Sequence, residues 1–311
     1  MRIVIALGGN ALLRQREPMT AETQRANVRR AVAAVLPLFE AGHQLVITHG
    51  NGPQVGLLAL QAAAGPKDGA YPLDVLDAET EGMVGYLIEQ ELDNALPGGR
   101  LVATLLTQIL VDRRDPAFRH PTKPIGPLYD KAGATRLAEA RGWTVADVGS
   151  GWRRVVPSPR PLQVLEARVI ELLASQGVTV ICAGGGGIPV LERSNGTLHG
   201  VEAVIDKDLA SALLARQLGA GHLMLLTDVD GVYLDWGLPS AKLIKRAGPR
   251  ALDPADFAPG SMRPKLEAAI GFTAETGRPA SIGRLEDATR ILAGAAGTRI
   301  DAVTTGLVLS P

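Results

Sequence analysis

The sequence is poor in the features that mark several large classes of protein. Only one of its 311 residues is cysteine, Cys182, which excludes an intrachain disulfide and a multi-cysteine metal centre and favours a reducing compartment. Basic and acidic residues number 32 each, so the chain lacks the positive bias of proteins that bind nucleic acids or acidic membranes. No apolar run approaches the roughly 20 residues of a membrane span, and Ile3 to Leu7 is too short for the core of a signal peptide. We therefore expect a cytoplasmic protein.

Aromatic residues are also scarce, at 4%, whereas hydrophobic residues make up 46% of the chain. This composition, rich in Ala, Leu and Val, is typical of an α/β protein, and the length suffices for two lobes or one large unit. Short apolar runs alternate with segments of helical periodicity. Strands are predicted at 3–7, 45–48, 101–106, 178–182 and 223–226, and helices at 21–40, 79–92 and from about 261. Such alternation predicts a mainly parallel sheet covered by helices on both faces.

The segment 112–161 has a different texture. Its seven prolines prevent long regular helices, and only 132–140 is predicted to be helical. We interpret the segment as an excursion from the sheet, a lid or protruding subdomain. We place a lobe boundary near Gly200, which gives an N-terminal lobe, 1–199, and a C-terminal lobe, 200–311.

Three glycine-bearing loops each follow a predicted strand. They are Gly8-Gly9-Asn10, His49-Gly50-Asn51-Gly52 and Gly184 to Gly187. In an open parallel sheet these loops emerge at the same carboxyl edge, where ligands bind. Three loops at one edge favour a binding cleft over ordinary turns. His49 alone is better read as a structural hydrogen bonder than as a base, and Cys182 as a core residue.

Two lysines are predicted in the first turns of separate helices. Asp206 suits an N-cap, and Lys207 and Asp208 follow it; Ser261 suits another N-cap, ahead of Lys265. A lysine at the positive end of a helix is unfavourable unless an anion binds there. A single such lysine is best read as pointing to solvent, but two of them favour a phosphate clamp, with Asp208 placed to orient both ammonium groups.

Two common nucleotide motifs are absent or poorly matched. No G-x-x-x-x-G-K-[ST] occurs, which excludes an ordinary P-loop enzyme. The run from Gly50 to Gly56 has its third glycine one residue late for a dinucleotide fingerprint, so it is a weak signal for NAD.

Ten segments, spread over nearly the whole chain, resemble those of carbamate kinases within the amino acid kinase superfamily. They are ALGGNAL (6–12), THGNGPQVG (48–56), EGMVGY (81–86), DPAF (115–118), PTKPIGPLY (121–129), GWRRVVPSP (151–159), GGGGIPV (184–190), VEAVIDKDLA (201–210), LTDVDGVY (226–233) and GSMRPK (260–265). The proline-rich excursion is the most specific of these features, because it resembles the subdomain that marks carbamate kinases among their relatives. Glu81 is a departure, since an uncharged residue, often Gln, is usual there.

The resemblance implies an eight-stranded, mainly parallel three-layer α/β/α sandwich and a homodimer. It implies phosphoryl transfer between ATP and carbamate, run towards ATP in catabolism of arginine or related nitrogen compounds, without a general base. It assigns Lys207, Lys265 and Lys123 to the phosphoryl group, with Asp208 as their organiser. Acceptor binding would fall to Gly8, Gly9, Asn10, Gly50, Asn51 and Gly52. Nucleotide binding would fall to Gly185, Thr227, Asp228, Tyr233, Ser261 and Met262.

No His or Cys spacing typical of a metal site occurs, so we expect no metal-ligating residues and a Mg²⁺ ion held by the phosphates of ATP or ADP. Three alternatives remain open at this stage. The chain could act on another small acceptor, such as acetylglutamate or fosfomycin; it could be an inactive nucleotide sensor; or it could be an NAD oxidoreductase.

Overall fold

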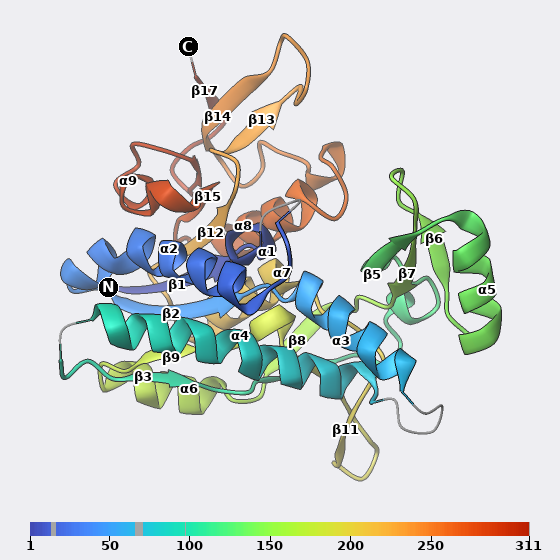
Figure 1. The fold of residues 1–311 in the computed structure, drawn as a ribbon. Coiled ribbons are helices and arrows are strands. Elements are labelled where there is room, and N and C mark those ends of the chain that lie inside the picture. Colours follow the sequence, from blue (N-terminus) through green and yellow to red (C-terminus); the bar gives the residue numbers. More distant parts are fainter. Residues whose placement is uncertain (14–16, 66–70, 97, 311) are drawn as a thin grey trace.

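One large sheet forms the centre of the molecule (Figure 1). The computed structural model describes residues 1–13, 17–65, 71–96 and 98–310, and only the backbone of Asn10, Ala11 and Ala63. Within these residues the sheet has ten strands in the order β13-β14-β16-β15-β12-β1-β2-β9-β3, with β17 also paired to β14. The strands are β1 Arg2–Leu7, β2 Gln44–His49, β3 Val102–Thr104, β9 Thr179–Ile181, β12 His222–Thr227, β13 Val232–Leu234, β14 Lys242–Ala247, β15 Ala280–Arg284, β16 Thr298–Ile300 and β17 Leu307–Leu309.

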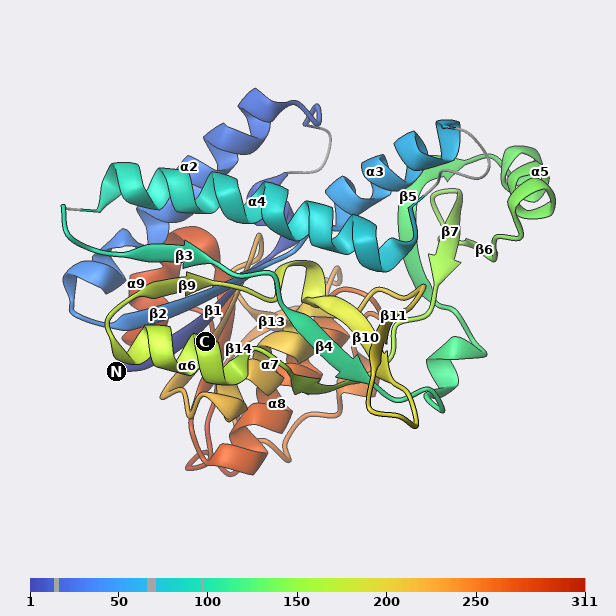
Figure 2. The same cartoon turned by 90° about the horizontal axis from the view of Figure 1, so that it is seen from below.

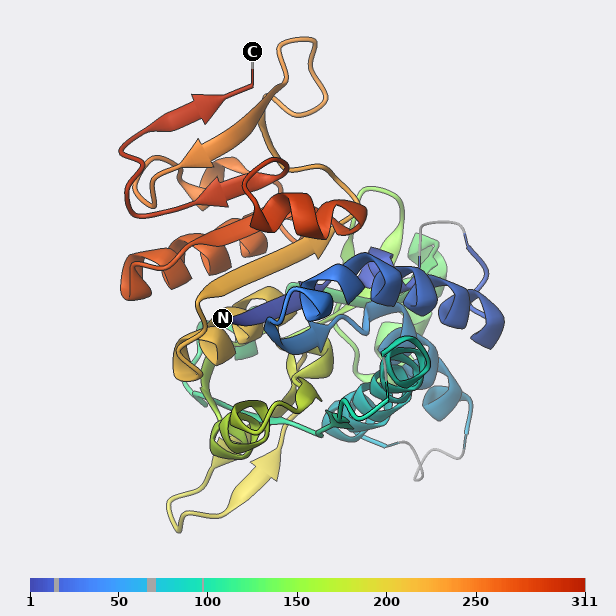
Figure 3. The same ribbon diagram turned by 90° about the vertical axis from the view of Figure 1, so that its left-hand side faces the viewer.

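The strands from β15 to β3 along this order run parallel. Beyond β15 the pairing becomes mixed, because β16 is antiparallel to β15 and both β13 and β17 are antiparallel to β14. Figure 3 shows these C-terminal strands, in orange and red, stacked beyond β12. The mainly parallel sheet is therefore confirmed, but it has ten strands among the described residues instead of eight, because an antiparallel ribbon extends the C-terminal edge.

Helices cover both faces of the sheet, and successive side chains of β1 point alternately to one face and to the other. Ile3, Ile5 and Leu7 pack on one face with helices α2, α4 and α9. Val4 and Ala6 pack on the other face with α6, α7 and α8. Figure 2 shows α2 and α4 on one side of the strands and α6, α7 and α8 on the other. The helices are α2 Ala21–Glu40, α4 Leu73–Ala95, α6 Ala167–Ser175, α7 Lys207–Gln217, α8 Met262–Thr276 and α9 Ala288–Leu292. The three-layer α/β/α architecture is confirmed.

The proline-rich excursion forms a small unit that projects from the main body (Figure 1). Its three-stranded sheet has the order β5-β7-β6 and carries helix α5. The elements are η1 Pro116–Phe118, β5 Lys123–Tyr129, α5 Lys131–Arg141, β6 Val145–Asp147 and β7 Trp152–Val156. We call residues 112–161 the protruding subdomain. Helix α3, Gly52–Ala64, packs against it through a cluster that includes Val55, Ile125 and Val156.

A second sheet, of four strands in the order β11-β10-β4-β8, links the subdomain to the main body. Its strands are β4 Gln108–Val111, β8 Pro161–Val164, β10 Ile188–Glu192 and β11 Leu198–Gly200. Short helical segments complete the fold: α1 Gly9–Leu12, η2 Gly184–Gly186, η3 Pro254–Asp256 and η4 Leu285–Asp287. Within the described ranges no helix combines the length and the apolar character needed to cross a membrane.

Candidate active site at the carboxyl edge of the sheet

The three glycine loops meet at one edge of the sheet, as the sequence predicted. They follow β1, β2 and β9, which are parallel neighbours. The backbone of Gly8 donates to Leu226 O at 2.9 Å, so the first loop also touches the end of β12. A Cβ on Gly50 would lie 3.0 Å from Gly9 N and 3.5 Å from Lys207 Cδ. The first of these loops is partly helical, since α1 begins at Gly9; the side chain of Asn10 lies outside the described part of the structure.

The run from Gly184 to Gly187 is buried and closely packed on all sides. A Cβ on Gly184 would lie 2.4 Å from the His49 ring, and one on Gly185 would lie 2.1 Å from the Asn51 amide. Gly185 also has a φ of +69°, a conformation that side-chain-bearing residues rarely adopt. We call residues 184–187 the β9 turn and residues 49–52 the β2 loop. The absence of side chains at these glycines allows the β9 turn to pack closely against the β2 loop.

The polar side chains of the β2 loop are turned inward. Asn51 donates through its amide nitrogen to Asp77 Oδ1 at 3.1 Å and to Thr80 Oγ1 at 2.8 Å, both on α4. His49 Nδ1 lies 3.1 Å from Gly50 O, and because a carbonyl can only accept, Nδ1 carries the proton. Burial lowers the pKa of His49 to about 4, so the ring is neutral at physiological pH. The Asn51 side chain thus supports the loop, and backbone groups remain for a ligand.

Lys207 and Lys265 are brought together on one carboxylate, although 58 positions separate them in the sequence. Lys207 Nζ lies 2.5 Å from Asp208 Oδ1, and Lys265 Nζ lies 2.8 Å from Asp208 Oδ2. Both lysine side chains are only 12% exposed, so the reading in which they point to solvent is wrong. We call these three residues the lysine clamp.

The charges of the lysine clamp reinforce one another. Burial opposes ionisation of Asp208, but the two ammonium groups override it and hold the pKa of this carboxyl well below its usual range. Burial lowers the pKa of Lys207, with Asp208 acting against that shift. For Lys265, burial is outweighed by Asp208 and other carboxylates, so its pKa is raised. The clamp therefore presents two cations and one anion, a net positive charge, at the start of α7.

Lys123 reaches the same place from the protruding subdomain. Its Nζ lies 2.8 Å from Asp206 Oδ2, while Asp206 Oδ1 accepts the backbone N–H of Asp208 at 2.9 Å and so caps α7. The N-cap predicted at Asp206 is confirmed. The ion pair between Asp206 and Lys123 could not be predicted from the sequence, because 83 positions separate the two residues.

The residues expected at the nucleotide lie around the ends of β12 and the start of α8. Thr227 ends β12 and donates to Asp228 Oδ1 at 3.1 Å. Tyr233, on β13, donates to Asp230. Met262 opens α8 and Ser261 holds its N-cap position, but the Ser261 side chain makes no capping hydrogen bond within the described residues. Its ψ of −87° is outside the extended region that a capping side chain requires, so the predicted cap is wrong.

Two buried acids on α4, Asp77 and Glu81, were not predicted to act together. Glu81 accepts the backbone N–H groups of Thr107 at 3.0 Å and Gly184 at 2.8 Å, so its carboxyl group faces the protein backbone. One signal in the sequence could have found the pair. Asp77, Glu81, Val84 and Ile88 share a helical stripe, and two acids on an otherwise apolar stripe require buried partners.

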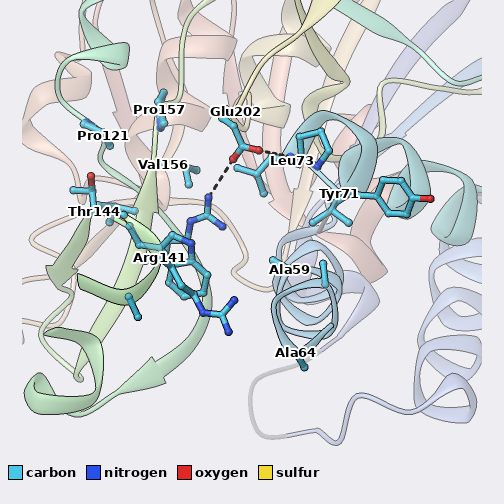
Figure 4. A pocket seen from close by; sticks show the side chains of 18 of the residues that line it. Ala59, Ala64, Tyr71, Leu73, Pro121, Arg141, Thr144, Val156, Pro157 and Glu202 are labelled. Atoms are coloured by element: carbon cyan, nitrogen blue, oxygen red, sulfur yellow. Dashed lines mark hydrogen bonds and ion pairs between the residues drawn. The ribbon is translucent and has the colours of Figure 1, made fainter. Parts of the chain in front are cut away.

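A cleft of about 980 Å³ lies to one side of this edge, between the protruding subdomain, α3 and the start of α4. Figure 4 shows Glu202 at its border. Glu202 accepts from Arg154 Nη2 at 3.2 Å and from the backbone N–H of Leu73 at 2.9 Å. The lysine clamp does not line it, and its α3 residues, Ala59 to Ala64, lie several residues beyond Gly52. We therefore base the site on the clamp and the glycine loops, where convergent charge and backbone amides lie.

The donor set does not form a protein cage for a metal ion. Over the described ranges no group of three or more His, Cys, Asp or Glu side chains is placed to hold one. Asp208, the carboxylate of the clamp, and Asp206, the N-cap of α7, are already ion-paired to lysines.

Comparison with known proteins gives consistent matches over nearly the whole chain. The model of the amino acid kinase family matches residues 1–284. The chain is 55% identical to a carbamate kinase of Haemophilus influenzae over 307 residues, 99% of each chain. It is 54% identical to a carbamate kinase of Rhizobium meliloti, over 96% of this chain and 93% of the relative. A solved structure of carbamate kinase from Giardia lamblia bound to AMP-PNP superposes with a TM-score of 0.88 at 42% identity, covering 96% of this chain and 98% of that one.

Proposed function

The chain belongs to the amino acid kinase family, and from this membership and its likeness to carbamate kinases we propose that it transfers a phosphoryl group between ATP and carbamate. The observation that carries the proposal is the lysine clamp. Two buried lysines share Asp208 beside the glycine loops, and paired cations of this kind stabilise a phosphoryl group in transfer.

The reaction needs charge neutralisation more than proton transfer. In the direction of ATP formation, an oxygen of the ADP β-phosphate attacks the phosphorus of carbamoyl phosphate. The P–O bond to the carbamoyl group breaks, and carbamate leaves as an anion. Both the attacking and the leaving oxygen are ionised, so no general base is required. This agrees with the neutral, inward-turned state of His49. The protein's task is to hold two anions in line and to offset the charge on the transferring group.

Lys207 and Lys265 are proposed to contact that group. An ammonium has three N–H donors, and each lysine uses one on Asp208, which leaves donors for phosphoryl oxygens. Asp208 keeps the two cations close together and aimed. Gly9 and Gly52, together with Asn10 and Asn51, are proposed to supply backbone amides to the acceptor. Gly8 and Gly50, whose N–H groups donate to Leu226 O and Leu7 O, are proposed to line the acceptor site as close-packed backbone.

Lys123 is proposed to contact the acceptor from the side of the protruding subdomain. Its pairing with Asp206 places the protruding subdomain within one salt bridge of the clamp. When a phosphorylated acceptor binds here, its oxygens could replace Asp206 as the partner of Lys123. This would make closure of the subdomain depend on the acceptor.

The nucleotide is proposed to lie on the C-terminal lobe, 200–311, with the acceptor on the N-terminal lobe, 1–199. Thr227, Asp228 and Tyr233 border the proposed nucleotide position on one side, and Ser261 and Met262 on the other, with Gly185 nearest the phosphates. The support is that Lys265 of the lysine clamp lies in the first turn of α8, and that the charge of Asp228, the residue after β12, contributes to the raised pKa of Lys265.

Mg²⁺ is proposed to enter with the nucleotide and to be held chiefly by its phosphates, since the described carboxylates form no cage. Bound there, it would supply further positive charge.

We propose a cytoplasmic homodimer that forms ATP in the catabolism of arginine or related nitrogen compounds. The single cysteine supports the compartment. The sheet ends at β3, whose outer side is unpaired among the described strands, and Leu101, Leu106 and Leu172 are exposed near this edge and on α6. An exposed edge with apolar neighbours suits a self-complementary contact.

The direct test mixes the purified protein with ADP, Mg²⁺ and carbamoyl phosphate and measures ATP. Formation of ATP is expected; its absence in an otherwise folded protein would refute the proposal and would favour an inactive nucleotide sensor. Acetyl phosphate and acetylglutamyl phosphate serve as alternative donors, and a preference for either would assign another member of the family.

A further inference from the structure

Two acidic side chains lie one helical turn apart on α4, beneath the carboxyl edge of the sheet. Asp77 is 2% exposed and Glu81 is fully buried. Positions i and i+4 project from the same helix face, so the two carboxyl groups are neighbours. Burying two carboxylates together is costly and is retained only where specific partners hold them. Two partners of this pair, Asn51 and Gly184, lie in the glycine loops of the proposed active site.

Glu81 holds two segments that the chain brings together from distant places. Its Oε1 accepts the N–H of Gly184 at 2.8 Å, and its Oε2 accepts the N–H of Thr107 at 3.0 Å. Thr107 Oγ1 in turn accepts the N–H of Ala183 at 2.9 Å. Both oxygens of Glu81 therefore face donors. An ionised carboxylate satisfies both, whereas a protonated one turns an O–H against one of them.

Asp77 differs from Glu81 in the hydrogen bonding of its two oxygens. Its Oδ1 accepts from Asn51, but its Oδ2 has no hydrogen-bond partner among the described residues. Burial raises the pKa of Asp77 well above its usual range, and the charge of Glu81 adds to this effect. A proton on Oδ2 costs no hydrogen bond there. The pair is thus best satisfied with the charge on Glu81 and the proton on Asp77.

The contacts of Glu81 connect it to the lysine clamp through the β9 turn and the β2 loop. The turn that Glu81 holds is packed so closely that a Cβ on Gly184 would clash with the His49 ring. The residue after His49, Gly50, lies against Gly9 and the side chain of Lys207. A shift of the β9 turn would therefore move the β2 loop that faces Lys207.

We propose that Glu81 is a positioning residue for phosphoryl transfer: as a carboxylate it fixes the β9 turn, and through that turn the β2 loop, against Lys207, while Asp77 serves as its neutral neighbour. The inference rests on the proposed function. It assigns Glu81 a role through the backbone of the β9 turn, because both of its oxygens accept backbone N–H groups.

The ionisation of Glu81 gives this role a dependence on pH. Burial raises its pKa to about 8, against the two backbone N–H groups, which lower it. The other titratable groups around it are His49, which is neutral, Cys182, whose pKa burial raises, and Glu166, whose charge opposes ionisation of Glu81. Because Glu81 gains its charge as pH rises, turnover should increase between about pH 7 and pH 9.

The test compares three isosteric variants of α4 in the assay of ATP formation, with thermal unfolding measured for each. Glu81→Gln replaces one acceptor oxygen with a donor, so kcat should fall about 10-fold to 100-fold with little change in the KM for ADP, and its rise with pH should vanish. Asp77→Asn imitates the protonated acid and should keep both kcat and the pH profile. Glu91→Gln, a buried carboxylate of the same helix that pairs with Arg29, should alter only the unfolding temperature.

A Glu81→Gln enzyme with wild-type kcat and pH profile would overturn the proposal, and so would an Asp77→Asn enzyme impaired as strongly as Glu81→Gln. If Glu81→Gln does not fold, the pH profile of the wild-type enzyme serves instead, and a kcat that does not rise between about pH 7 and pH 9 would overturn the proposal. These outcomes are separate from failure of the proposed function, which would leave the wild-type protein inactive with carbamoyl phosphate at every pH.

Discussion

Lys123, on the protruding subdomain, forms a 2.8 Å ion pair with Asp206, the N-cap of helix α7. Asp206 thus has two roles, because its other oxygen accepts the N–H of Asp208. One carboxylate therefore links the subdomain to α7, the helix that carries Lys207 and Asp208. This link allows the position of the subdomain to be tested separately from the cap.

Two substitutions at Asp206 should separate these roles. Serine retains a capping oxygen but loses the ion pair, so Asp206→Ser should fold with near-normal stability while kcat/KM for carbamoyl phosphate falls about 10-fold. Asp206→Ala loses both and should in addition unfold about 1 kcal/mol more easily. Steady-state kinetics and urea unfolding measure the two effects. Equal kinetics for Asp206→Ser and the wild type would show that the ion pair is not used.

Removal of Lys207 should abolish most of the turnover without unfolding the protein. Lys207→Ala takes away one of the two cations on Asp208, and loss of one preorganised charge stabiliser costs on the order of 10² to 10³ in kcat. Lys245→Ala, an exposed lysine of β14, is the matched control and should leave kcat unchanged. A fully active Lys207→Ala enzyme would contradict the assignment of the clamp.

Asp208 should matter for stability as well as for activity. Asp208→Asn leaves two buried ammonium groups without a counter-charge, and removal of one partner from a buried ion pair costs about 3 to 5 kcal/mol. Urea unfolding checks this, with the exposed pair of Asp112 and Arg114 as the control, where Asp112→Asn should change stability by less than about 1 kcal/mol.

The same residue should give a dependence of stability on pH. The folded-state pKa of Asp208 is lowered, so its stabilisation is present above the unfolded value of about 3.9 and is lost as pH falls below it. The wild-type free energy of unfolding should therefore decline more steeply than that of Asp208→Asn from pH 5 downward. Parallel curves over this range would show that Asp208 is not preferentially ionised in the folded state.

The β9 turn should not tolerate a side chain at Gly185. Its φ of +69° disfavours alanine, and a Cβ there would lie 2.1 Å from the Asn51 amide. Gly185→Ala should lose at least about 2 kcal/mol of stability from strain and overpacking. Gly271→Ala is the matched control: it lies inside α8, a Cβ there meets no described atom within 4 Å, and it should stabilise by about 0.5 to 1 kcal/mol. Thermal unfolding that ranks the two variants equally would contradict the close packing of the turn.

The local structure of this protein could be predicted well where a short stretch of sequence decides it. Helix α2 begins and ends where the periodicity from Ala21 to Glu40 predicts, and Asp206 caps α7 because its side chain needs only the next turn of backbone. Ser261 was equally suitable as a cap, yet the backbone at the start of α8, held by contacts of Arg263 with Ala255 and Phe257, turns it out of the capping conformation.

The sequence by itself determined the alternating strands and helices, the excursion rich in proline and the glycine loops at strand ends, because these depend on residues close together in the chain. Only the tertiary structure decided which partners the charged side chains take. Lys265 shares Asp208 with Lys207, Lys123 pairs with Asp206, and Glu81 binds the amides of Thr107 and Gly184. Such contacts join positions 26 to 103 residues apart, and they form only when the packed sheet brings their helices and loops within hydrogen-bonding distance.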